Sequence, residues 1–190
     1  MFDLSATDLT EEQKCTVLEF LSHHGQVIGE DESDLGCTST VEHSIDVQGS
    51  IPIKQHYRRF PLPLRKEIKR EVEKLLAKGI IEPSMSAWSS RLVPVRKKNG
   101  KMRLCIDYRA INEKTRKDSF KLPYLADAVS QFGNSRHLSS LDLLAGYHRI
   151  KLSKESKEIT AFSTGDDLYQ FTRLPFGVVV VVVVVALGTD

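Results

Sequence analysis

An acidic residue inside an apolar run constrains this chain more than any other single feature. Leu138 to Ile150 reads LSSLDLLAGYHRI, so Asp142 stands between two leucines in a stretch that favours a strand. A carboxylate there is costly to bury without a partner, which is either local backbone N–H groups or a bound group. The Ala145-Gly146 pair that follows favours a turn. The alternation from Tyr147 to Leu152 then favours a second extended segment, which places an aromatic ring and two cations near the carboxylate.

Charge is distributed unevenly along the 190 residues, although the formal net charge is only +2. Residues 1–50 hold one Lys or Arg and 11 Asp or Glu, residues 51–155 hold 24 and 10, and residues 156–190 hold two and four. A basic middle segment of this size is typical of proteins that bind polyanions. Cations scattered over many solvated faces would give the same counts, so charge alone leaves both interpretations open.

Cysteine usage and hydropathy favour an intracellular protein, cytoplasmic or nuclear. Cys15, Cys37 and Cys105 are widely spaced and odd in number, which fits a reducing compartment better than a disulfide framework. The first ten residues lack the basic start and apolar core of a signal peptide. The longest apolar run, Val178 to Ala186, is too short to span a bilayer, so we expect no membrane partner.

Two helices are predicted from spacing and end signals. Thr10 to Gly25 begins with a capping box and ends at a glycine, and Leu64 to Lys78 carries an apolar stripe that Gly79 terminates. Between them lies an acidic linker and a basic, proline-rich stretch expected to be extended. Shorter helices are predicted at 123–132 and 153–158, strands at 41–47, 138–143, 159–163 and 168–172, and a polar connection at 110–120. Gly165-Asp166-Asp167 is interpreted as the loop of the last hairpin.

The stretch from Leu92 to Tyr108 predicts a β-hairpin. Asn99-Gly100 between two alternating runs is a strong signal for a two-residue turn. With that turn at the centre, one face of the hairpin is apolar and pairs Val95 with Leu104 and Val93 with Ile106.

The same register places four cations on the other face of the hairpin. Arg96 falls opposite Arg103, near Lys98 and Lys101. Like charges directly opposite each other are destabilising, so the cluster needs either open solvent or an anion. A phosphate-bearing ligand would supply that anion, and a solvated hairpin tip is the alternative.

Several blocks extend in order over most of the chain from Val41 to Gly177. They are VEHSIDV with the basic stretch after it, EVEKLLAKGIIEPSMSAWSSRLVPVRKKNGKMRLCIDYRAIN, KLPYLADAV, LSSLDLLAGYHRIKL, ITAF and LYQFTRLPFG. In this order and spacing they resemble the reverse transcriptase of gypsy-type LTR retrotransposons and, more distantly, retroviral polymerases. Such a series is far more specific than any one motif.

The resemblance implies an α+β fold, namely the fingers and part of the palm of a right-hand polymerase with an N-terminal helical extension. The expected divisions are an acidic helix and linker at 1–50, a fingers-like region at 51–136, a partial palm at 137–177 and a poly-valine tail outside the family pattern at 178–190. The implied partners are an RNA or DNA template-primer and deoxynucleoside triphosphates.

The resemblance also assigns roles to individual residues. Asp142 corresponds to the first catalytic aspartate, a ligand of Mg²⁺, and Leu143 would add a backbone carbonyl. The residues implied for nucleotide binding are Lys97, Lys98, Arg103, Tyr147, Phe176 and Gly177. In the family the cations hold the triphosphate, the tyrosine lies under the sugar and disfavours a 2′-hydroxyl, and the last two form the template-side floor of the pocket. Asp107 and Arg109 resemble structural or template-positioning residues.

The family pattern breaks after Gly177. Nucleotidyl transfer uses two divalent ions, and one carboxylate cannot hold both. The family supplies the other aspartates from a Tyr-x-Asp-Asp box, but here eight valines follow, and no such box occurs in the 190 residues. The run is either a buried strand or the product of decay or a shifted reading frame. We therefore expect a truncated reverse transcriptase that is inactive as it stands, or alternatively a non-enzymatic nucleic-acid-binding remnant of a retrotransposon.

Overall fold

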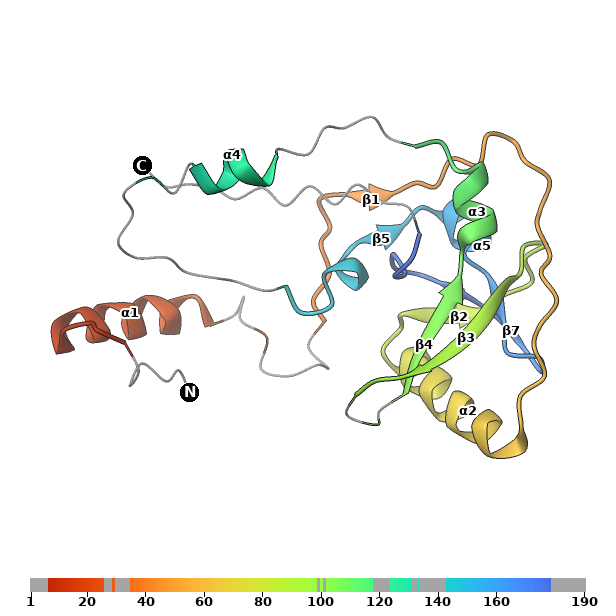
Figure 1. Cartoon of the computed structure of the whole chain (residues 1–190), viewed down its shortest axis with the longest axis horizontal. Coiled ribbons are helices and arrows are strands. Elements are labelled where there is room, and N and C mark those ends of the chain that lie inside the picture. The colour runs from red at the N-terminus through yellow and green to blue at the C-terminus, as the bar shows by residue number, and fades with distance from the viewer. Residues whose placement is uncertain are drawn as a thin grey trace. The chain divides into compact units, whose positions relative to one another are not determined.

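The computed structural model describes residues 7–25, 29, 35–98, 100, 102–117, 124–130, 133 and 143–178 (Figure 1). The chain divides into two compact units, Met1–Leu35 and Gly36–Asp190. Several predictions fall wholly or partly outside the described residues, among them Asp142, the strand at 138–143 apart from its last residue, Asn99 and Lys101 of the predicted hairpin, and the valine run beyond Val178. None of the helices in the described ranges is long and apolar enough to cross a membrane.

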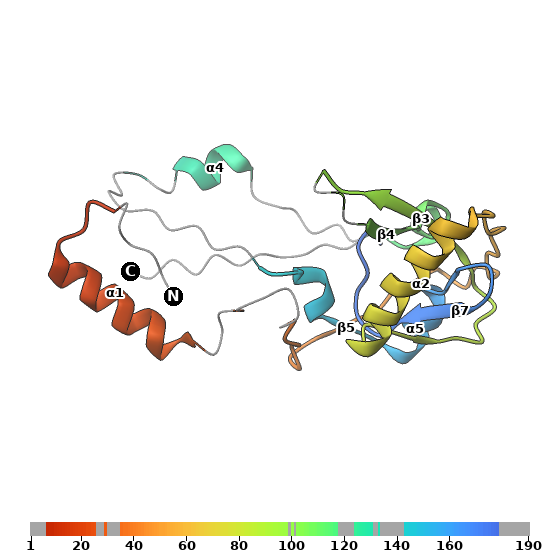
Figure 2. The same ribbon diagram turned by 90° about the horizontal axis from the view of Figure 1, so that it is seen from below.

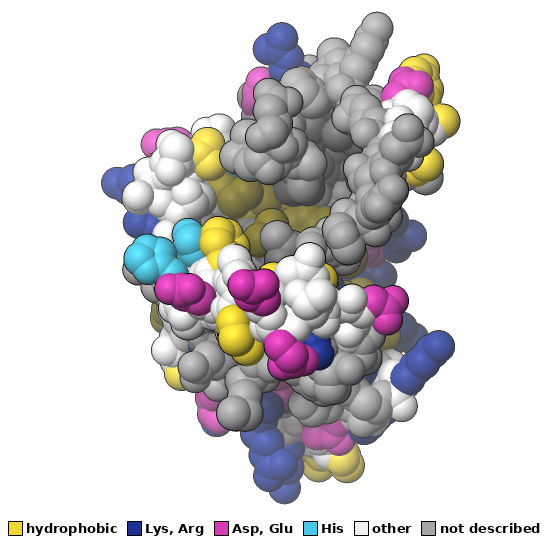
Figure 3. All heavy atoms as spheres, turned by 90° about the vertical axis from the view of Figure 1, so that its left-hand side faces the viewer, with side chains coloured by type: hydrophobic (Ala, Val, Ile, Leu, Met, Phe, Trp, Pro, Cys, Tyr) yellow, Lys and Arg dark blue, Asp and Glu magenta, His cyan; other side chains and the backbone are white. Residues whose placement is uncertain are grey.

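Helix α1 (Glu11–His23), in the first unit, begins where the sequence predicts. The Gln13 backbone N–H donates to the Thr10 hydroxyl at 3.3 Å, and the Thr10 N–H donates to the Gln13 side chain at 2.9 Å. This reciprocal pair satisfies N–H groups that the helix itself leaves without partners. No residue of α1 is buried, and acidic and histidine side chains are exposed on the face drawn in Figure 3.

A five-stranded sheet forms the centre of the second unit, with strand order β2-β7-β6-β3-β4. The strands are β2 (Ile81–Pro83), β3 (Ser90–Arg96), β4 (Met102–Asp107), β6 (Phe162–Ser163) and β7 (Leu168–Phe171). Neighbouring strands are antiparallel except β3 and β6, which are parallel. The hairpin β6–β7, which was predicted, is inserted between β2 and β3. Segments far apart in the sequence therefore become neighbours in the sheet.

Two helices cover this sheet, α2 (Leu62–Ala77) against β2 and β4, and α5 (Lys154–Ile159) against β7 (Figures 1 and 2). The apolar stripe of α2 buries Ile68 and Val72, as the spacing predicts. The core also contains large side chains from the strands and from the segments next to them. These include Ile80, Leu92, Tyr108, Ile111, Phe162 and Leu174.

The register of the β3–β4 hairpin differs from the predicted one. Val95 pairs with Arg103, and the strands end at Arg96 and Met102, so the connection is longer than a two-residue turn. The Gly100 N–H donates to the Lys97 carbonyl at 2.9 Å, which closes the turn one residue earlier than predicted. Because strand residues alternate between faces, this shift of one residue places the two arginines on opposite faces. The predicted apolar face and the predicted pairing of Arg96 with Arg103 are therefore both wrong, and Lys101 lies outside the described residues.

The segment after Leu143 also differs from the prediction. Instead of an extended run from Tyr147, a 3₁₀ helix spans Gly146–Arg149, and only β5 (Lys151–Leu152) is a strand. It pairs in parallel with β1 (Glu42–His43), which lies within the strand predicted at 41–47. The 3₁₀ helix follows a left-handed residue, Ala145, which has φ 47°.

Two short helices lie in the region between β4 and the 3₁₀ helix. α4 (Leu125–Ser130) lies within the helix predicted at 123–132. α3 (Arg109–Lys114) occupies the start of what was predicted to be a polar connection, so that part of the prediction is wrong. Its sequence is mostly polar, but one apolar side chain, Ile111, is only 2% exposed and anchors the helix in the core.

Candidate functional site

Three exposed side chains from separate elements form a stack on the second unit: Arg103 of β4, Tyr147 of the 3₁₀ helix and Phe176 beyond β7. The guanidinium carbon of Arg103 lies 4.4 Å from the centroid of the Phe176 ring. The rings of Phe176 and Tyr147 meet edge to face, with centroids 5.5 Å apart and planes at 84°. Both rings are about half exposed. This Arg103–Phe176–Tyr147 stack presents aromatic surface beside a positive charge, a combination suited to a ligand that has a flat or apolar part and phosphates.

Local backbone geometry directs Tyr147 outward. Ala145 has φ 47° and ψ 47°, a left-handed conformation that is costly for a residue with a Cβ. At the next residue, Gly146, an added Cβ would lie in ordinary van der Waals contact, 3.4 Å from the Leu143 Cβ. The 3₁₀ helix then turns the chain so that Tyr147 is exposed while His148 points inward.

His148 anchors the 3₁₀ helix to the core. Its ring stacks on Phe171 with centroids 6.3 Å apart and planes at 11°, and its Nδ1 lies 3.2 Å from the Leu174 carbonyl oxygen, which accepts a hydrogen bond from a protonated Nδ1. Burial lowers the pKa of His148, and the charge of Arg173 lowers it further. At neutral pH the imidazole is therefore uncharged, as a ring buried beside cations should be.

The segment that carries Phe176 is fixed on both sides of it. Leu174 and Pro175 are fully buried and Val178 is 6% exposed, so the phenyl ring is the part that faces solvent. Gly177 adopts φ 97°, which favours glycine, and its carbonyl oxygen accepts a hydrogen bond from the Asn112 side-chain amide at 2.8 Å. Asn112 in α3 thus ties this segment to the end of β4.

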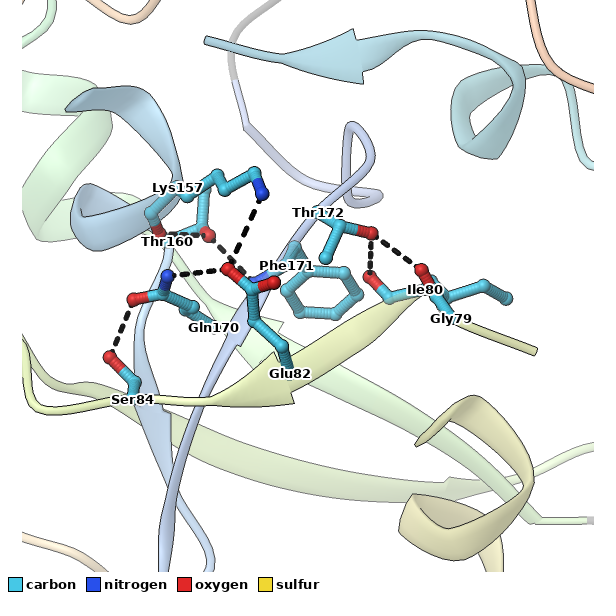
Figure 4. Close-up of polar contacts among 9 residues, drawn as sticks. All are labelled: Gly79, Ile80, Glu82, Ser84, Lys157, Thr160, Gln170, Phe171 and Thr172. Atoms are coloured by element: carbon cyan, nitrogen blue, oxygen red, sulfur yellow. Dashed lines mark hydrogen bonds and ion pairs between the residues drawn. The ribbon is translucent and has the colours of Figure 1, made fainter. Parts of the chain in front are cut away.

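Polar contacts hold the end of β7 from which this segment departs (Figure 4). The Thr172 hydroxyl lies 2.6 Å from the Gly79 carbonyl oxygen and 3.1 Å from that of Ile80. Nearby on the same two strands, Glu82 of β2 accepts hydrogen bonds from Gln170 Nε2 of β7 at 2.8 Å and from Lys157 Nζ of α5 at 3.4 Å. β2, β7 and α5 are therefore joined by side chains as well as by the strand ladder.

A second surface is a cavity of about 570 Å³ between β3, β4 and the extended segment that precedes α2. Its charged residues are almost all arginines, and we call it the arginine groove. The residues that define it are Arg58, Arg59, Phe60, Arg91, Asp107 and Arg109. An adjoining cavity of about 510 Å³ shares the last three charged residues and adds Lys54, His56 and one acid, Glu113. Such a row of guanidinium groups favours binding of a chain of phosphates.

Asp107 and Arg109 form an ion pair within the groove. Arg109 Nε and Nη2 donate to the two Asp107 carboxylate oxygens at 2.8 Å and 2.7 Å. These bonds hold the pKa of Asp107 below its usual value, and the positive charge of Arg91 acts in the same direction. Because a single carboxylate lines the groove beside four arginines, the groove keeps a net positive charge.

The structure brings together four of the residues that the family resemblance implied for nucleotide binding, Arg103, Tyr147, Phe176 and the adjacent Gly177. Lys97 and Lys98 are exposed in the loop between β3 and β4. Leu143 is described and 60% exposed, whereas Asp142 lies outside the described residues. In the ranges that are described, no group of three or more His, Cys, Asp or Glu could hold a metal ion.

Sequence reasoning did not find the arginine groove or the role of Asn112. The basic, proline-rich stretch was recognised as extended, but nothing local indicates that Arg58 and Arg59 lie across from Arg91 and Arg109. That arrangement depends on backbone pairing between residues 53–55 and Ser89. Cations that belong to different helices and strands show no periodic spacing in the sequence, so local patterns cannot predict that they meet.

The fold is that of part of a right-hand polymerase. The model of the reverse transcriptase (RNA-dependent DNA polymerase) family matches residues 95–189, half of the chain. The chain therefore belongs to the reverse transcriptase family.

Its relatives include Pol polyproteins of retrotransposons. The retrovirus-related Pol polyprotein from transposon 412 of Drosophila melanogaster is 43% identical over 132 residues, which are 66% of this chain and 11% of that protein. The one from transposon gypsy of the same organism is 40% identical over 116 residues, or 58% of this chain and 11% of that protein. The chain thus spans about a tenth of the length of these relatives.

Solved structures show the same fold. The native prototype foamy virus protease-reverse transcriptase superposes with a TM-score of 0.79 at 25% identity, over 91% of this chain and 23% of that one. A foamy viral protease-reverse transcriptase in complex with an RNA/DNA hybrid gives a TM-score of 0.74 at 20% identity, over 90% and 23%. These superpositions confirm the predicted α+β fold of polymerase fingers and palm.

Proposed function

We propose that this chain is the nucleotide-binding and template-binding part of an RNA-directed DNA polymerase. The observation that carries the proposal is the Arg103–Phe176–Tyr147 stack, with 4.4 Å between guanidinium and ring and 5.5 Å between rings. Residues from β4, the 3₁₀ helix and the segment after β7 meet there although nothing in their local sequence requires it. Membership in the family supports the same assignment.

Each residue of the stack can bind a different part of a deoxynucleoside triphosphate. The Arg103 guanidinium can bind phosphate oxygens through two N–H groups. The exposed Lys97 and Lys98 lie in the loop that follows β3 and can add positive charge toward the same phosphates. Tyr147 presents an aromatic edge and face on which a sugar without a 2′-hydroxyl can pack. Phe176 and Gly177 form the floor that such a nucleotide would contact.

Metal-dependent chemistry would need Asp142, which lies outside the described residues. The family expectation is Mg²⁺ held by the Asp142 carboxylate and the Leu143 carbonyl, where the ion would stabilise charge on the transferred phosphoryl group. One carboxylate cannot hold two ions, and the 190 residues contain no Tyr-x-Asp-Asp box. We therefore expect nucleotide and nucleic-acid binding from this chain but no primer extension.

A second candidate function is nucleic-acid binding without catalysis, which the arginine groove favours. With Arg109 paired to Asp107, the other three arginines around this cavity of about 570 Å³, Arg58, Arg59 and Arg91, would neutralise phosphates of a single strand. Binding of this kind weakens steeply with salt, because each phosphate contact releases a counterion. The two functions are compatible, since the groove and the stack lie at different ends of β4.

A nucleotide-binding titration tests the first proposal. The chain is titrated with a fluorescent deoxynucleoside triphosphate, and Arg103→Ala is expected to weaken binding by about tenfold, as the loss of a charge-assisted hydrogen bond implies. Arg96→Ala is the matched control, because Arg96 lies on the other face of the same hairpin and bonds Glu67 at 3.0 Å. Equal loss in both variants would mean that only overall charge matters and would refute the stack as the site.

A primer-extension assay tests the expected lack of catalysis. The chain is incubated with an RNA template, a DNA primer, deoxynucleoside triphosphates and Mg²⁺ or Mn²⁺. Incorporation that disappears in Asp142→Ala would show that the chain polymerises by itself and would overturn that expectation. No incorporation together with salt-dependent template binding would agree with it.

A further inference from the structure

Residues 54–60 form one wall of the arginine groove and its adjoining cavity, and their two halves are held in different ways. On the β3 side, the Gln55 N–H donates to the Ser89 carbonyl at 2.8 Å, and the Arg91 N–H donates to the Gln55 side chain at 3.0 Å. Arg91 Nε also reaches the His56 carbonyl at 3.4 Å. From residue 57 to residue 60, no backbone-to-backbone hydrogen bond to another described residue is present. The half of the wall that carries Arg58 and Arg59 therefore depends on side-chain contacts.

Those contacts come from the turn of the β6–β7 hairpin, residues 164–167. The ring of Tyr57 packs directly on Gly165, so closely that an added Cβ would lie 2.8 Å from Tyr57 Cδ2. The next residue, Asp166, forms an ion pair with Arg65 in the first turns of α2, with 2.6 Å between Arg65 Nη2 and Asp166 Oδ2. The turn thus contacts the chain just before α2 and the helix itself.

The wall has open space on both of its sides. Arg58, Arg59 and Phe60 line the arginine groove, and the same three residues line a second cavity of about 280 Å³. Turn 164–167 forms the far side of that second cavity through Thr164, Gly165 and Asp166. Because neither side of the wall is filled by core packing, the position of Arg58 and Arg59 relative to Arg91 depends on the contacts that turn 164–167 makes.

We propose that turn 164–167 is a positioning element for nucleic-acid binding, in which Gly165 and Asp166 determine where Arg58 and Arg59 stand in the arginine groove. The inference rests on the proposed binding of nucleic acid in that groove. The Arg65 and Asp166 side chains are 44% and 64% exposed. Their ion pair therefore contributes little to the stability of the fold. Its role is instead to hold the Arg58 and Arg59 side chains in position opposite Arg91 and Arg109 across the groove.

The experiment measures binding of a fluorescein-labelled single-stranded RNA by the full chain, by anisotropy over a series of salt concentrations. Asp166→Asn is expected to weaken binding about three- to tenfold at low salt and to lower the slope of log affinity against log salt by about 0.7 for each phosphate that is no longer bound. Gly165→Ala is expected to act in the same way, because the new Cβ displaces Tyr57 and the residue's φ of 100° strains the turn that holds it. A change in salt slope is not produced by reduced stability alone.

Asp167→Asn is the matched control. It removes the same charge from the same turn, but its carboxylate contacts Tyr169 and not α2. Removing an acid near a basic groove should by itself strengthen binding of a polyanion, so the positioning role predicts opposite directions for the two asparagine variants. The exchange variant Arg65→Asp with Asp166→Arg, which restores the ion pair in reverse, is expected to recover the slope and at least half of the decrease in affinity.

The outcomes separate this inference from the function it rests on. Weaker binding in Asp166→Asn, but not in Asp167→Asn, with recovery in the exchange variant, supports the positioning role. Equal affinities and slopes in the two asparagine variants refute it while leaving nucleic-acid binding intact. A wild-type chain that binds no RNA at low salt refutes the proposed function, and the inference falls with it.

Discussion

Replacing Tyr108 by phenylalanine tests how the core supports both surfaces. Tyr108 is 2% exposed, and its hydroxyl donates to the Thr160 carbonyl at 2.8 Å, which links the end of β4 to the end of α5. Thr160 is 0% exposed, so the variant loses a hydrogen bond and leaves a buried carbonyl without that partner. Such a loss costs about 1 to 3 kcal/mol. For a unit of this size the midpoint of thermal unfolding should fall by about 2 to 4 °C per kcal/mol.

Urea unfolding followed by tryptophan fluorescence measures this free energy directly, because Trp88 is the single tryptophan and is buried. Tyr169→Phe is the control, since the Tyr169 hydroxyl reaches Asp167 at 3.3 Å in an exposed position and its removal should change the unfolding free energy by less than about 0.5 kcal/mol. Tyr108 also stands between Asp107 and Arg109, so Tyr108→Phe should weaken RNA binding in parallel. Equal stability of the two phenylalanine variants would refute the role assigned to the buried hydroxyl.

Three further perturbations follow from the site. Burial lowers the pKa of His148 below 6.5, so as the pH falls the unfolded chain takes up a proton before the folded chain does, and the stability that is complete above pH 6.5 decreases. His148→Gln should therefore make the unfolding free energy less dependent on pH between about 7 and 5. An unchanged pH dependence would exclude His148 as its source. Glu82→Ala removes the bonds to Gln170 and Lys157 and should cost about 1 kcal/mol in urea unfolding, with an unchanged free energy counting against the network in Figure 4. Gly177→Ala, at φ 97°, should cost about 1 to 3 kcal/mol and weaken triphosphate binding, and full affinity would show that Phe176 keeps its place without the glycine.

Patterns confined to one element were predictable from the sequence. The capping box at Thr10 and the apolar stripe of α2 each depend on spacing within a helix, and both appear as expected. The residues of the stack were found by resemblance to the family. The arginine groove was not found, because Arg58 and Arg91 are brought together by sheet pairing at Ser89 and not by any local period.

The position of Asn112 shows a second limit. In the sequence it is one polar residue in a polar stretch, and its hydrogen bond to Gly177 spans from α3 to the segment beyond β7. A bond of this kind depends on the two elements being placed first by the core around Tyr108 and Ile111. The sequence pattern indicated neither the burial of Ile111 in this polar stretch nor which polar side chain meets which carbonyl.

The β3–β4 hairpin shows that core packing can override a strong local turn signal. A two-residue turn at Asn99-Gly100 would pair Leu92 with Asp107 and would turn either Leu92 or Ile106 out of the core, because a shift of one residue reverses the faces. In the structure these two residues pair with each other and are 2% and 8% exposed. Burying one such side chain contributes about 1.5 to 3 kcal/mol, which is more than a preferred turn type can offset.

The same register decides the electrostatics of the site. It avoids the pair of opposed arginines that the two-residue turn would create, and it directs Arg96 to Glu67 of α2. Arg103 is then left on the other face, where Phe176 holds its guanidinium 4.4 Å from the ring centroid. The register that core packing favours thus pairs Arg96 with a carboxylate and places Arg103 against an aromatic ring. Because a ring holds the cation without cancelling its charge, Arg103 is the one that remains available to a phosphate.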